Sequence, residues 1–150
     1  MKFEYVKDWM STDVKTISPN ATLPEAHSFM ISEGIRRLPV VDKSGRLIGI
    51  VTLSDVQRVE TSPATTLSVW ELNYLLAKMQ IKKIMTPSPI TVTPETTIGE
   101  AARIMLDKKI SGIPVLNKAG NLVGIITESD IFSMVVLREW QESDVDPVPA

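Results

Sequence analysis

Hydrophobic residues recur with helical spacing in some stretches of the chain and as short continuous runs in others. Leu23, Ala26 and Met30 lie three or four residues apart, as on one face of a helix. Thr22, followed three residues later by Glu25, is typical of a capping box, in which each side chain binds the backbone of the other. The pattern therefore predicts a helix that begins just after Thr22.

Extended segments precede and follow this helix. Residues 15–19 end in a proline, which has no N–H group for a strand ladder. Residues 38–41 and 47–51 are apolar and flank a turn, residues 42–45, that opens on Asp and closes on Gly, as hairpin turns do. The strand at 47–51 is nearly all apolar, so we expect it to be buried on both faces. Another helix is expected to begin near Ser54.

The same pattern occurs twice. Shifting the sequence by 75 residues aligns 46 positions from Met10 to Asp55 without a gap, and 18 of them are identical. Agreement at this level indicates an internal repeat. The second copy has the same order of strand, helix, strand, strand and helix, which predicts a mixed α/β (α+β) fold. Gly34 is a plausible helix terminator, whereas the equivalent Lys109 implies that the second helix ends differently in detail.

The repeat also predicts the domain organisation. It comprises a first unit at 6–60, a linker helix at 61–80, a second unit at 81–136 and a flexible tail at 141–150. Residues 59–64 are mostly polar and contain a proline, so we expect a loop there. Residues 67–79 carry apolar side chains, including Trp70, at roughly helical spacing, which predicts a linker helix docked on the core.

Composition narrows the classes of function. Apolar residues make up 43% of the 150 residues, enough for a core, and the net charge of −2 provides no basic excess for binding nucleic acid. The chain has no cysteine, which excludes disulfides and thiolate metal sites. No apolar stretch approaches the length of a membrane span, and the first residues have no signal-peptide core. We therefore expect a cytoplasmic protein without membrane association.

Recognisable catalytic motifs are absent from the sequence. His27, the sole histidine, aligns with Ala102 in the repeat, and we expect it to be at the surface or partly packed. No Ser–His–Asp or Cys–His set can be assembled around it, and neither a P-loop nor a dinucleotide-binding glycine motif occurs. Four methionines are expected to pack in or against the core: Met30, Met79, Met85 and Met105. The sequence thus predicts no enzyme, no metal site and no cofactor.

Two strings of residues carry a family resemblance. Residues 38–42 with 49–55, and residues 113–117 with 124–130, each combine an apolar-Pro-Val strand with a Gly-Ile strand that ends in Thr-x-Ser-Asp. Together and in register, they make residues 6–134 resemble a tandem pair of cystathionine-β-synthase (CBS) domains, also called a Bateman module. The long linker helix adds a fainter likeness to stand-alone CBS-pair proteins of the acetoin-utilisation type.

The resemblance implies two β-α-β-β-α units around a pseudo-twofold axis, with two clefts between them, in a homodimer that forms a disc of four units. Many members bind AMP, ADP, ATP or S-adenosylmethionine and thereby regulate an attached or partner protein. The leading hypothesis is thus a sensor of adenosine-containing ligands. The alternative is a ligand-independent dimerisation or docking module with vestigial clefts, in which Trp70 or Trp140 makes the contacts.

The resemblance also assigns candidate ligand-binding residues. Asp55 and Asp130 match the family's ribose-binding carboxylate, and an ionised carboxylate accepts hydrogen bonds from vicinal hydroxyls. The alternative is that each simply caps the start of a helix. Four hydroxyl residues match positions that contact phosphate or ribose: Thr52, Ser54, Thr127 and Ser129. Their alternative role is N-capping, by Ser54 and Ser129.

A second group of residues is expected beside the adenine base, where the backbone reads the base and an apolar side chain packs on it. These residues are Thr16, Ile17, Thr91 and Val92. Ordinary core packing is the alternative for Ile17 and Val92. Pro39 and Pro114 match positions expected to shape the floor of each cleft.

Adjacent arginines distinguish the two copies. Arg36 and Arg37 precede the first Leu-Pro, where the family often places phosphate-binding side chains, and two guanidiniums can hold a di- or triphosphate. Arginines that are simply solvated are the alternative. The second copy has Ser111 and Gly112 at these positions, with two lysines just upstream as partial substitutes. We therefore expect unequal anion affinity at the two sites, while the sequence leaves open which Asp shares a cleft with the arginines.

Overall fold

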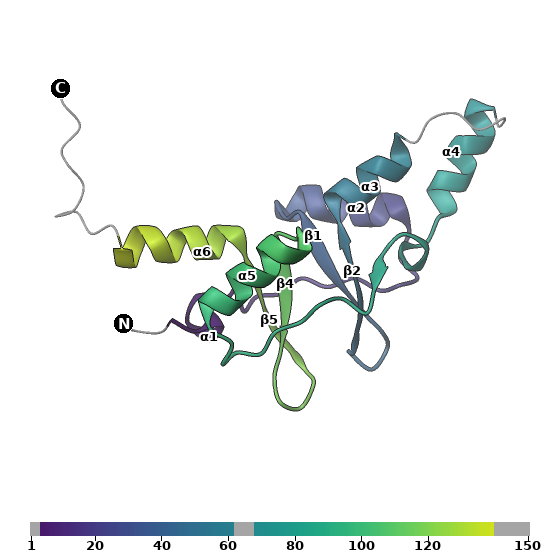
Figure 1. Cartoon of the computed structure of the whole chain (residues 1–150). Helices are drawn as coiled ribbons and strands as arrows, with labels where there is room; N and C mark the ends of the chain where they lie inside the picture. The colour runs from purple at the N-terminus through teal and green to yellow at the C-terminus, as the bar shows by residue number, and fades with distance from the viewer. Residues whose placement is uncertain (1–3, 62–67, 140–150) are drawn as a thin grey trace, which may run out of the picture. The chain divides into compact units, whose positions relative to one another are not determined.

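The computed structural model describes residues 4–61 and 68–139 (Figure 1). These residues divide into two compact units. We call residues 15–89 the middle unit, and the described parts of residues 1–14 and 90–150 the terminal unit. Both units combine helices with a small antiparallel sheet, which confirms the α+β fold class.

Each unit contains the elements of one hairpin and its helices. The middle unit consists of α2 (Leu23–Glu33), β1 (Arg37–Val41), β2 (Leu47–Thr52), α3 (Leu53–Glu60), α4 (Val69–Lys78), a 3-10 turn (Ile81–Lys83) and β3 (Thr86–Pro87). The terminal unit consists of α1 (Val6–Trp9), α5 (Ile98–Lys108), β4 (Gly112–Leu116), β5 (Leu122–Thr127), α6 (Glu128–Met134) and a π-helical segment (Val135–Glu139). The extended segment before α2 or α5 forms only a single parallel bridge, from Ile17 to Val40 and from Val92 to Val115.

Both hairpins are completed along one edge by a distant segment. β1 pairs with β2 so that Leu38 lies opposite Val51, and β4 pairs with β5 in the equivalent register. The outer edge of β2 pairs with β3, and the outer edge of β5 receives a bridge from Ser11 to Ile125. β3 lies at the start of the second repeat (residues 85–130), and Ser11 lies at the start of the first (residues 10–55). The boundaries of the two sequence repeats therefore differ from the boundaries of the two compact units.

A methionine packs over a glycine at each of these edges. Met85 lies against Gly49 of β2, and Met10 lies against Gly124 of β5. A Cβ atom on either glycine would collide with the methionine sulfur. Because glycine has no Cβ, the segment comes close enough for Ser11 to exchange two backbone hydrogen bonds with Ile125, each of 3.0 Å.

Separate hydrophobic cores stabilise the two units. The core of the middle unit consists of Leu23, Ala26, Met30, Leu38, Val40, Val51, Val56 and Ile81. The core of the terminal unit consists of Val6, Val92, Ile98, Ala101, Met105, Ile113, Val115 and Ile126. Burial of one large apolar side chain contributes about 1.5–3 kcal/mol. The packing roles expected of the methionines are confirmed, since Met30 and Met105 are buried and Met79 and Met85 contact the middle core.

The second strand of each hairpin is less buried than its composition implies. Gly49 and Val51 of β2 are buried, whereas Ile48 and Ile50 are half-buried, and β5 repeats this alternation. The expectation of burial on both faces is therefore wrong. The strand belongs to an antiparallel hairpin, which needs only one covered face.

The helix ends follow the local signals closely. The Thr22 hydroxyl accepts a hydrogen bond from the Glu25 N–H, and the Glu25 carboxylate accepts one from the Thr22 N–H, which confirms the capping box. α2 ends at Gly34 in the left-handed conformation, with φ of 65°. α5 ends at Lys109 in the same conformation, with φ of 55°. Lysine thus adopts the backbone conformation that glycine has in the first copy. The expected difference in detail lies in the hydrogen bonds, since the Gly34 N–H donates to the Ile31 and Met30 carbonyl oxygens and the Lys109 N–H to that of Met105.

The end of α3 extends into the expected loop. Val59 and Glu60 are the last residues of α3, so the prediction of a loop from residue 59 is wrong for these two positions. Residues 62–67, Trp140 and the tail at 141–150 lie outside the described residues. Within residues 4–61 and 68–139, no helix is long and apolar enough to cross a membrane.

Helix α4 (Val69–Lys78) lies within the segment expected to form the linker helix and docks on the core by one face. Leu76 packs against the core of the middle unit, and α4 contacts α2. None of the residues of α4 is fully buried, and the Trp70 side chain is 85% exposed. Trp70 therefore does not anchor the helix to the core of its own unit.

Candidate functional site

A recess opens in the middle unit where β1, β2 and α3 meet. Its volume is about 370 Å³, and its lining consists of Arg36, Arg37, Thr52, Leu53, Ser54 and Gln57. Arg37 pairs with Thr52 across the hairpin. The Leu53 N–H donates a hydrogen bond of 2.7 Å to the Arg36 carbonyl oxygen. These backbone contacts hold both arginines beside the first turn of α3.

The start of α3 is closed by a reciprocal cap. The Thr52 hydroxyl accepts a hydrogen bond of 3.1 Å from the Asp55 N–H, and the Asp55 carboxylate accepts one of 2.9 Å from the Thr52 N–H. Thr52 is therefore the N-cap, and the alternative role of Ser54 as N-cap is wrong. The serine lies inside the first turn, because the helix already begins at Leu53. Its side chain lines the recess instead.

The terminal unit begins α6 with the equivalent residues, but here the threonine hydroxyl donates its hydrogen bond. The Asp130 carboxylate accepts hydrogen bonds from the Thr127 N–H at 2.8 Å and from the Thr127 hydroxyl at 3.1 Å. The N-cap is Thr127, so the prediction of capping by Ser129 is wrong for the same reason.

Both carboxylates assigned to ribose therefore have a capping role. Asp55 uses one oxygen for the cap, and its other oxygen lies 3.6 Å from the Arg58 guanidinium. Asp55 does not line the recess. The capping alternative for Asp55 and Asp130 is what the geometry shows, and a ribose contact by either residue stays a prediction.

The recess suits an anion with several oxygen atoms. Arg36 and Arg37 contribute two positive charges, and α3 directs the positive end of its dipole toward the same place. Ser54 and Gln57 add neutral hydrogen-bond donors. Hydrogen bonds between guanidinium groups and phosphate or carboxylate oxygens are among the stronger ones in proteins.

Two residues of the lining were missed by sequence reasoning. Gln57 lies three residues after Ser54, so helical periodicity could have placed both on one face of α3. Leu53 could not have been predicted as a site residue, because an apolar residue at that position is typical of core packing.

The place where β4, β5 and α6 meet in the terminal unit has the equivalent backbone hydrogen bond, but its side chains carry a negative instead of a positive charge. The Glu128 N–H donates to the Ser111 carbonyl oxygen at 3.1 Å, as Leu53 does to Arg36. Gly112 begins β4 at the position that Arg37 has in β1. The two arginines are thus replaced by uncharged residues, and the apolar Leu53 is replaced by the carboxylate of Glu128.

The residues assigned to the adenine base lie outside the recess. Thr16 and Thr91 are exposed, and Ile17 is half-buried. Val92 is buried in the core of the terminal unit, which supports its alternative role in packing. Pro39 and Pro114 are buried inside β1 and β4. Contacts of Thr16, Ile17, Thr91 and Val92 with a base stay predictions, as does the role of the two prolines in shaping a cleft floor.

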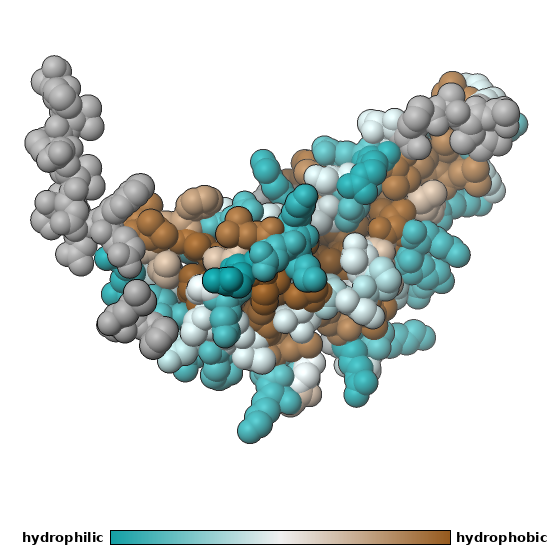
Figure 2. All heavy atoms as spheres, in the orientation of Figure 1, coloured by the Kyte–Doolittle hydropathy of each residue, from teal (hydrophilic) through white to brown (hydrophobic). Residues whose placement is uncertain are grey.

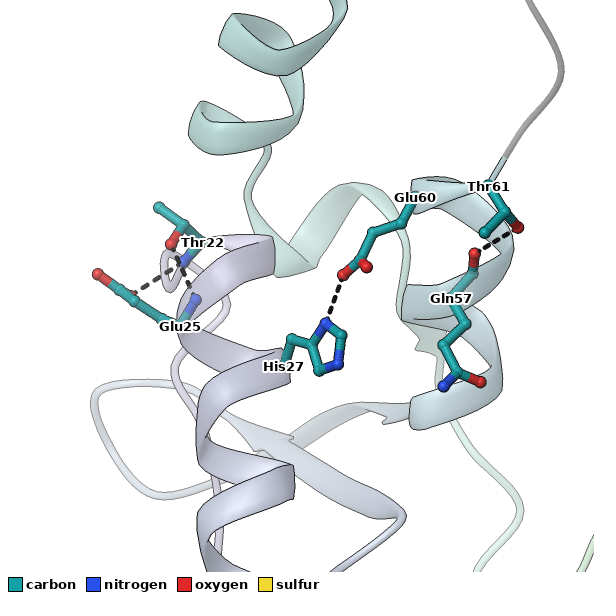
Figure 3. A network of polar contacts seen from close by, with 6 residues as sticks. All are labelled: Thr22, Glu25, His27, Gln57, Glu60 and Thr61. Atoms are coloured by element: carbon teal, nitrogen blue, oxygen red, sulfur yellow. Dashed lines mark hydrogen bonds and ion pairs between the residues drawn. The ribbon is translucent and has the colours of Figure 1, made fainter.

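His27 forms a polar contact away from the recess. Its Nδ1 atom lies 2.7 Å from the Glu60 carboxylate and joins α2 to the end of α3 (Figure 3). The His27 side chain is 33% exposed, which confirms the expectation of partial packing. Across the described ranges, no group of three His, Cys, Asp or Glu residues is placed to hold a metal ion.

A model of the CBS domain family matches residues 6–61 and, a second time, residues 81–137. The chain belongs to this family. The duplicated match confirms the tandem pair of CBS domains that the repeat implied.

Relatives of this CBS pair include both small and large proteins. It is 33% identical to a CBS domain-containing protein of Dictyostelium discoideum, over 96% of this chain and 95% of that protein. It is 38% identical to inosine-5'-monophosphate dehydrogenase of Korarchaeum cryptofilum, over 80% of this chain but only 22% of the enzyme. Because most of that enzyme is not matched, its activity does not follow for this CBS pair.

Solved structures of CBS pairs superimpose on most of this chain. The CBS domain pair of protein MJ0100, in complex with 5'-methylthioadenosine and S-adenosyl-L-methionine, is 31% identical, with a TM-score of 0.75 over 89% of this chain and 96% of that one. CBSX2 in complex with AMP is 26% identical, with a TM-score of 0.76 over 91% and 98%. A Vibrio cholerae protein assigned to acetoin utilisation is 27% identical, with a TM-score of 0.76 over 97% and 100%. The last match confirms the likeness to the acetoin-utilisation type.

Proposed function

We propose that this CBS pair is a regulatory module that binds an adenosine-containing ligand, with the phosphate of the ligand in the recess of the middle unit. The observation that carries the proposal is the position of Arg36 and Arg37 beside the capped start of α3. The complexes of similar CBS pairs with AMP and with S-adenosyl-L-methionine support the class of ligand. In this proposal, ligand binding controls a partner protein in the cytoplasm, and the CBS pair itself catalyses no reaction.

The charge of the recess favours a nucleotide over S-adenosylmethionine. A phosphate offers at least two charged oxygens to the two guanidinium groups, whereas S-adenosylmethionine carries a positive sulfonium beside its single carboxylate. Among AMP, ADP and ATP, the additional phosphates of ADP and ATP would use the second arginine. We therefore expect the affinities to follow the number of phosphate groups, with S-adenosylmethionine weakest.

The two units are expected to bind phosphate unequally. The terminal unit has Ser111 and Gly112 in place of the arginines, and Glu128 adds a negative charge at the start of α6. A carboxylate beside a phosphate raises the cost of binding it. We propose one phosphate-dependent ligand per chain, in the middle unit.

Calorimetric titration of the full chain with AMP, ADP, ATP and S-adenosylmethionine tests this proposal. The expected result is saturable binding of at least one nucleotide at one site per chain. Absence of binding of all four ligands to folded, ligand-free protein would overturn it. Saturation at two equivalent phosphate-dependent sites would overturn the inequality of the units.

The Arg36→Ala variant is predicted to weaken nucleotide binding about tenfold or more. Loss of one hydrogen bond to a charged group costs about 1.5–3 kcal/mol. Lys43→Ala is the matched control, because Lys43 is an exposed cation on the turn between β1 and β2 of the same unit. The same titration with adenosine, which has no phosphate, is expected to give equal affinities for parent and variant. Equal nucleotide affinities of Arg36→Ala and Lys43→Ala would contradict a phosphate contact.

A second candidate function is ligand-independent dimerisation or docking. The observation that favours it is a pair of exposed apolar residues at equivalent positions of the repeat, Ile31 on α2 and Leu106 on α5, which are 61% and 79% exposed. Phe132 of α6 is also 67% exposed. We propose a homodimer through these helix faces. Sedimentation of the chain with and without nucleotide tests it, since a dimer that ignores nucleotide favours the second candidate over the first.

A further inference from the structure

Among the described residues, one face of α4 in the middle unit carries exposed apolar side chains. Trp70, Tyr74 and Leu75 are 85%, 60% and 49% exposed. With the exposed Glu71 and Lys78, they form a continuous strip along the helix, which we call the α4 strip. Trp70, Glu71, Tyr74 and Leu75 line a shallow hollow of about 410 Å³. Figure 2 shows the brown of aliphatic residues along this helix, while its hydropathy scale draws tryptophan and tyrosine in pale colours.

The opposite face of α4 attaches the helix to its own unit. Leu76 packs against the core, and the exposed residues Asn73 and Ala77 line a separate recess of about 280 Å³ together with His27 and Glu60. The α4 strip is therefore free of the contacts that position the helix. An exposed surface with a tryptophan and a tyrosine side by side is typical of a protein interface.

The charges within the α4 strip lie at its two ends. Glu71 is in the first turn of the helix, and Lys78 is in the last. The Lys78 Nζ atom binds the Tyr74 hydroxyl at 2.6 Å and lies 4.3 Å from the centre of the tyrosine ring. Tyr74 thus keeps the ammonium group along the strip, next to the apolar side chains.

We propose that the α4 strip binds the α4 strip of a second copy of this chain in antiparallel orientation. Around a twofold axis near Tyr74 and Leu75, Glu71 of each copy lies opposite Lys78 of the other. Two ion pairs then flank the apolar centre, and the helix dipoles run in opposite directions. Parallel pairing would instead place Glu71 against Glu71 and Lys78 against Lys78. The charge pattern therefore selects the antiparallel dimer.

The size of the α4 strip predicts a weak contact. A buried aromatic side chain contributes about 150–250 Å². Two aromatic residues and one leucine fall short of the roughly 800 Å² per partner that a stable interface buries. The contact is therefore expected to depend on protein concentration, and it is separate from the helix faces of Ile31 and Leu106.

Disulfide trapping of the full chain tests the proposal, because the natural sequence has no cysteine. Leu75→Cys places a thiol near the proposed axis and is expected to give a disulfide-linked dimer on mild oxidation. Asn73→Cys is the matched control, since Asn73 is an exposed residue of the same helix that lies outside the α4 strip. The expected yield of dimer from Leu75→Cys is at least about fivefold that of the control. Equal yields would overturn the proposal.

Charge reversal in the Leu75→Cys background tests the orientation. Glu71→Lys and Lys78→Glu are each expected to reduce the yield of dimer about fivefold, because each creates two like-charged pairs across the axis. The double variant restores both ion pairs and is expected to return the yield to the level of Leu75→Cys alone. Failure of the double variant to recover, with its helical circular dichroism unchanged, would overturn antiparallel pairing and point to another partner for the α4 strip.

Discussion

Gly34 and Lys109 have the same left-handed backbone conformation at the ends of α2 and α5. For a residue with a Cβ atom, this conformation costs about 1–2 kcal/mol. The structure therefore contains a strained position in one copy of the repeat and a relaxed one in the other.

Lys109→Gly is predicted to raise the free energy of unfolding by about 0.5–1 kcal/mol, and Gly34→Ala to lower it by about 1 kcal/mol. Neither change meets a steric obstacle, since no neighbouring atom lies within 4 Å of a Cβ built on Gly34. Urea unfolding measures both effects. Gly99→Ala in the first turn of α5 is the control, and it is expected to stabilise. A neutral result for both Lys109→Gly and Gly34→Ala would contradict the argument from backbone strain.

Asp42 and Asn117 organise the equivalent turns of the two hairpins. One Asp42 oxygen accepts hydrogen bonds from the Ser44 hydroxyl at 2.7 Å and from the N–H groups of Ser44 and Arg46 at 2.9 and 3.0 Å. These bonds, the Ser44 hydroxyl foremost, hold the pKa of Asp42 below its ordinary value. The Asn117 side chain accepts the two equivalent backbone bonds without a charge.

A pH-dependent contribution to stability is predicted for Asp42. A carboxyl with a lower pKa in the folded state stabilises the fold above its unfolded pKa, and this effect is lost as the pH falls through the folded pKa. Asp42→Asn is therefore expected to be less stable than the parent at pH 7, and the difference is expected to shrink below about pH 4. Urea unfolding of both proteins across this range measures the difference. A difference that stays constant with pH would contradict an ionised role for Asp42.

At the scale of elements, the contact of a methionine with a glycine attaches each distant segment to its hairpin. Gly49→Ala is predicted to lower the free energy of unfolding by about 1–3 kcal/mol, because the added methyl group must displace Met85. In a Met85→Ala background, the same change is expected to cost much less. Thermal unfolding of the four proteins measures the coupling. Gly124→Ala with Met10→Ala is the matched pair in the terminal unit. If Gly49→Ala lowers the free energy of unfolding equally in the parent and in the Met85→Ala background, the contact is refuted.

The elements themselves were largely predictable, because their signals are local. The Thr22 capping box and the left-handed end at Gly34 both act within one helical turn. The N-caps of α3 and α6 were misassigned because Thr-x-Ser-Asp contains two residues that can cap. The hairpin decides between them: Thr52 is the last residue of β2, and the helix begins directly after it.

At the scale of the whole molecule, a compact unit requires residues from both repeats. Ile81 is fully buried in the core of the middle unit, and β3 covers the edge of β2. Both lie beyond the first repeat of the sequence. We predict that the fragment 15–89 unfolds cooperatively in urea, whereas the fragment 1–75, of equal length, does not. Circular dichroism measures both transitions. Cooperative unfolding of the fragment 1–75, which lacks Ile81 and β3, would show that their contacts are dispensable.

The candidate site was only partly predictable. Arg36 and Arg37 stand out because the repeat lacks them in its second copy. Thr52 and Ser54 stand out because the repeat keeps them. Asp55 was assigned to ribose, but it lies outside the recess and closes the cap, since its position three residues after Thr52 places it next to the Thr52 N–H. Gln57 lines the recess because α3 places it on the same side as Ser54.

The sequence by itself determined the duplicated unit, the order of its elements, most helix ends and the difference in charge between the two copies. These properties depend on spacing and residue type, which act over a few positions or are read by aligning the chain with itself. Tertiary structure alone decided that each hairpin takes its edge from the first residues of the other repeat, that Arg36 and Arg37 share a recess with Ser54 and Gln57, and that Trp70 stays exposed. Such contacts join residues far apart in the chain, and no local pattern of residue types specifies which of the possible partners will meet.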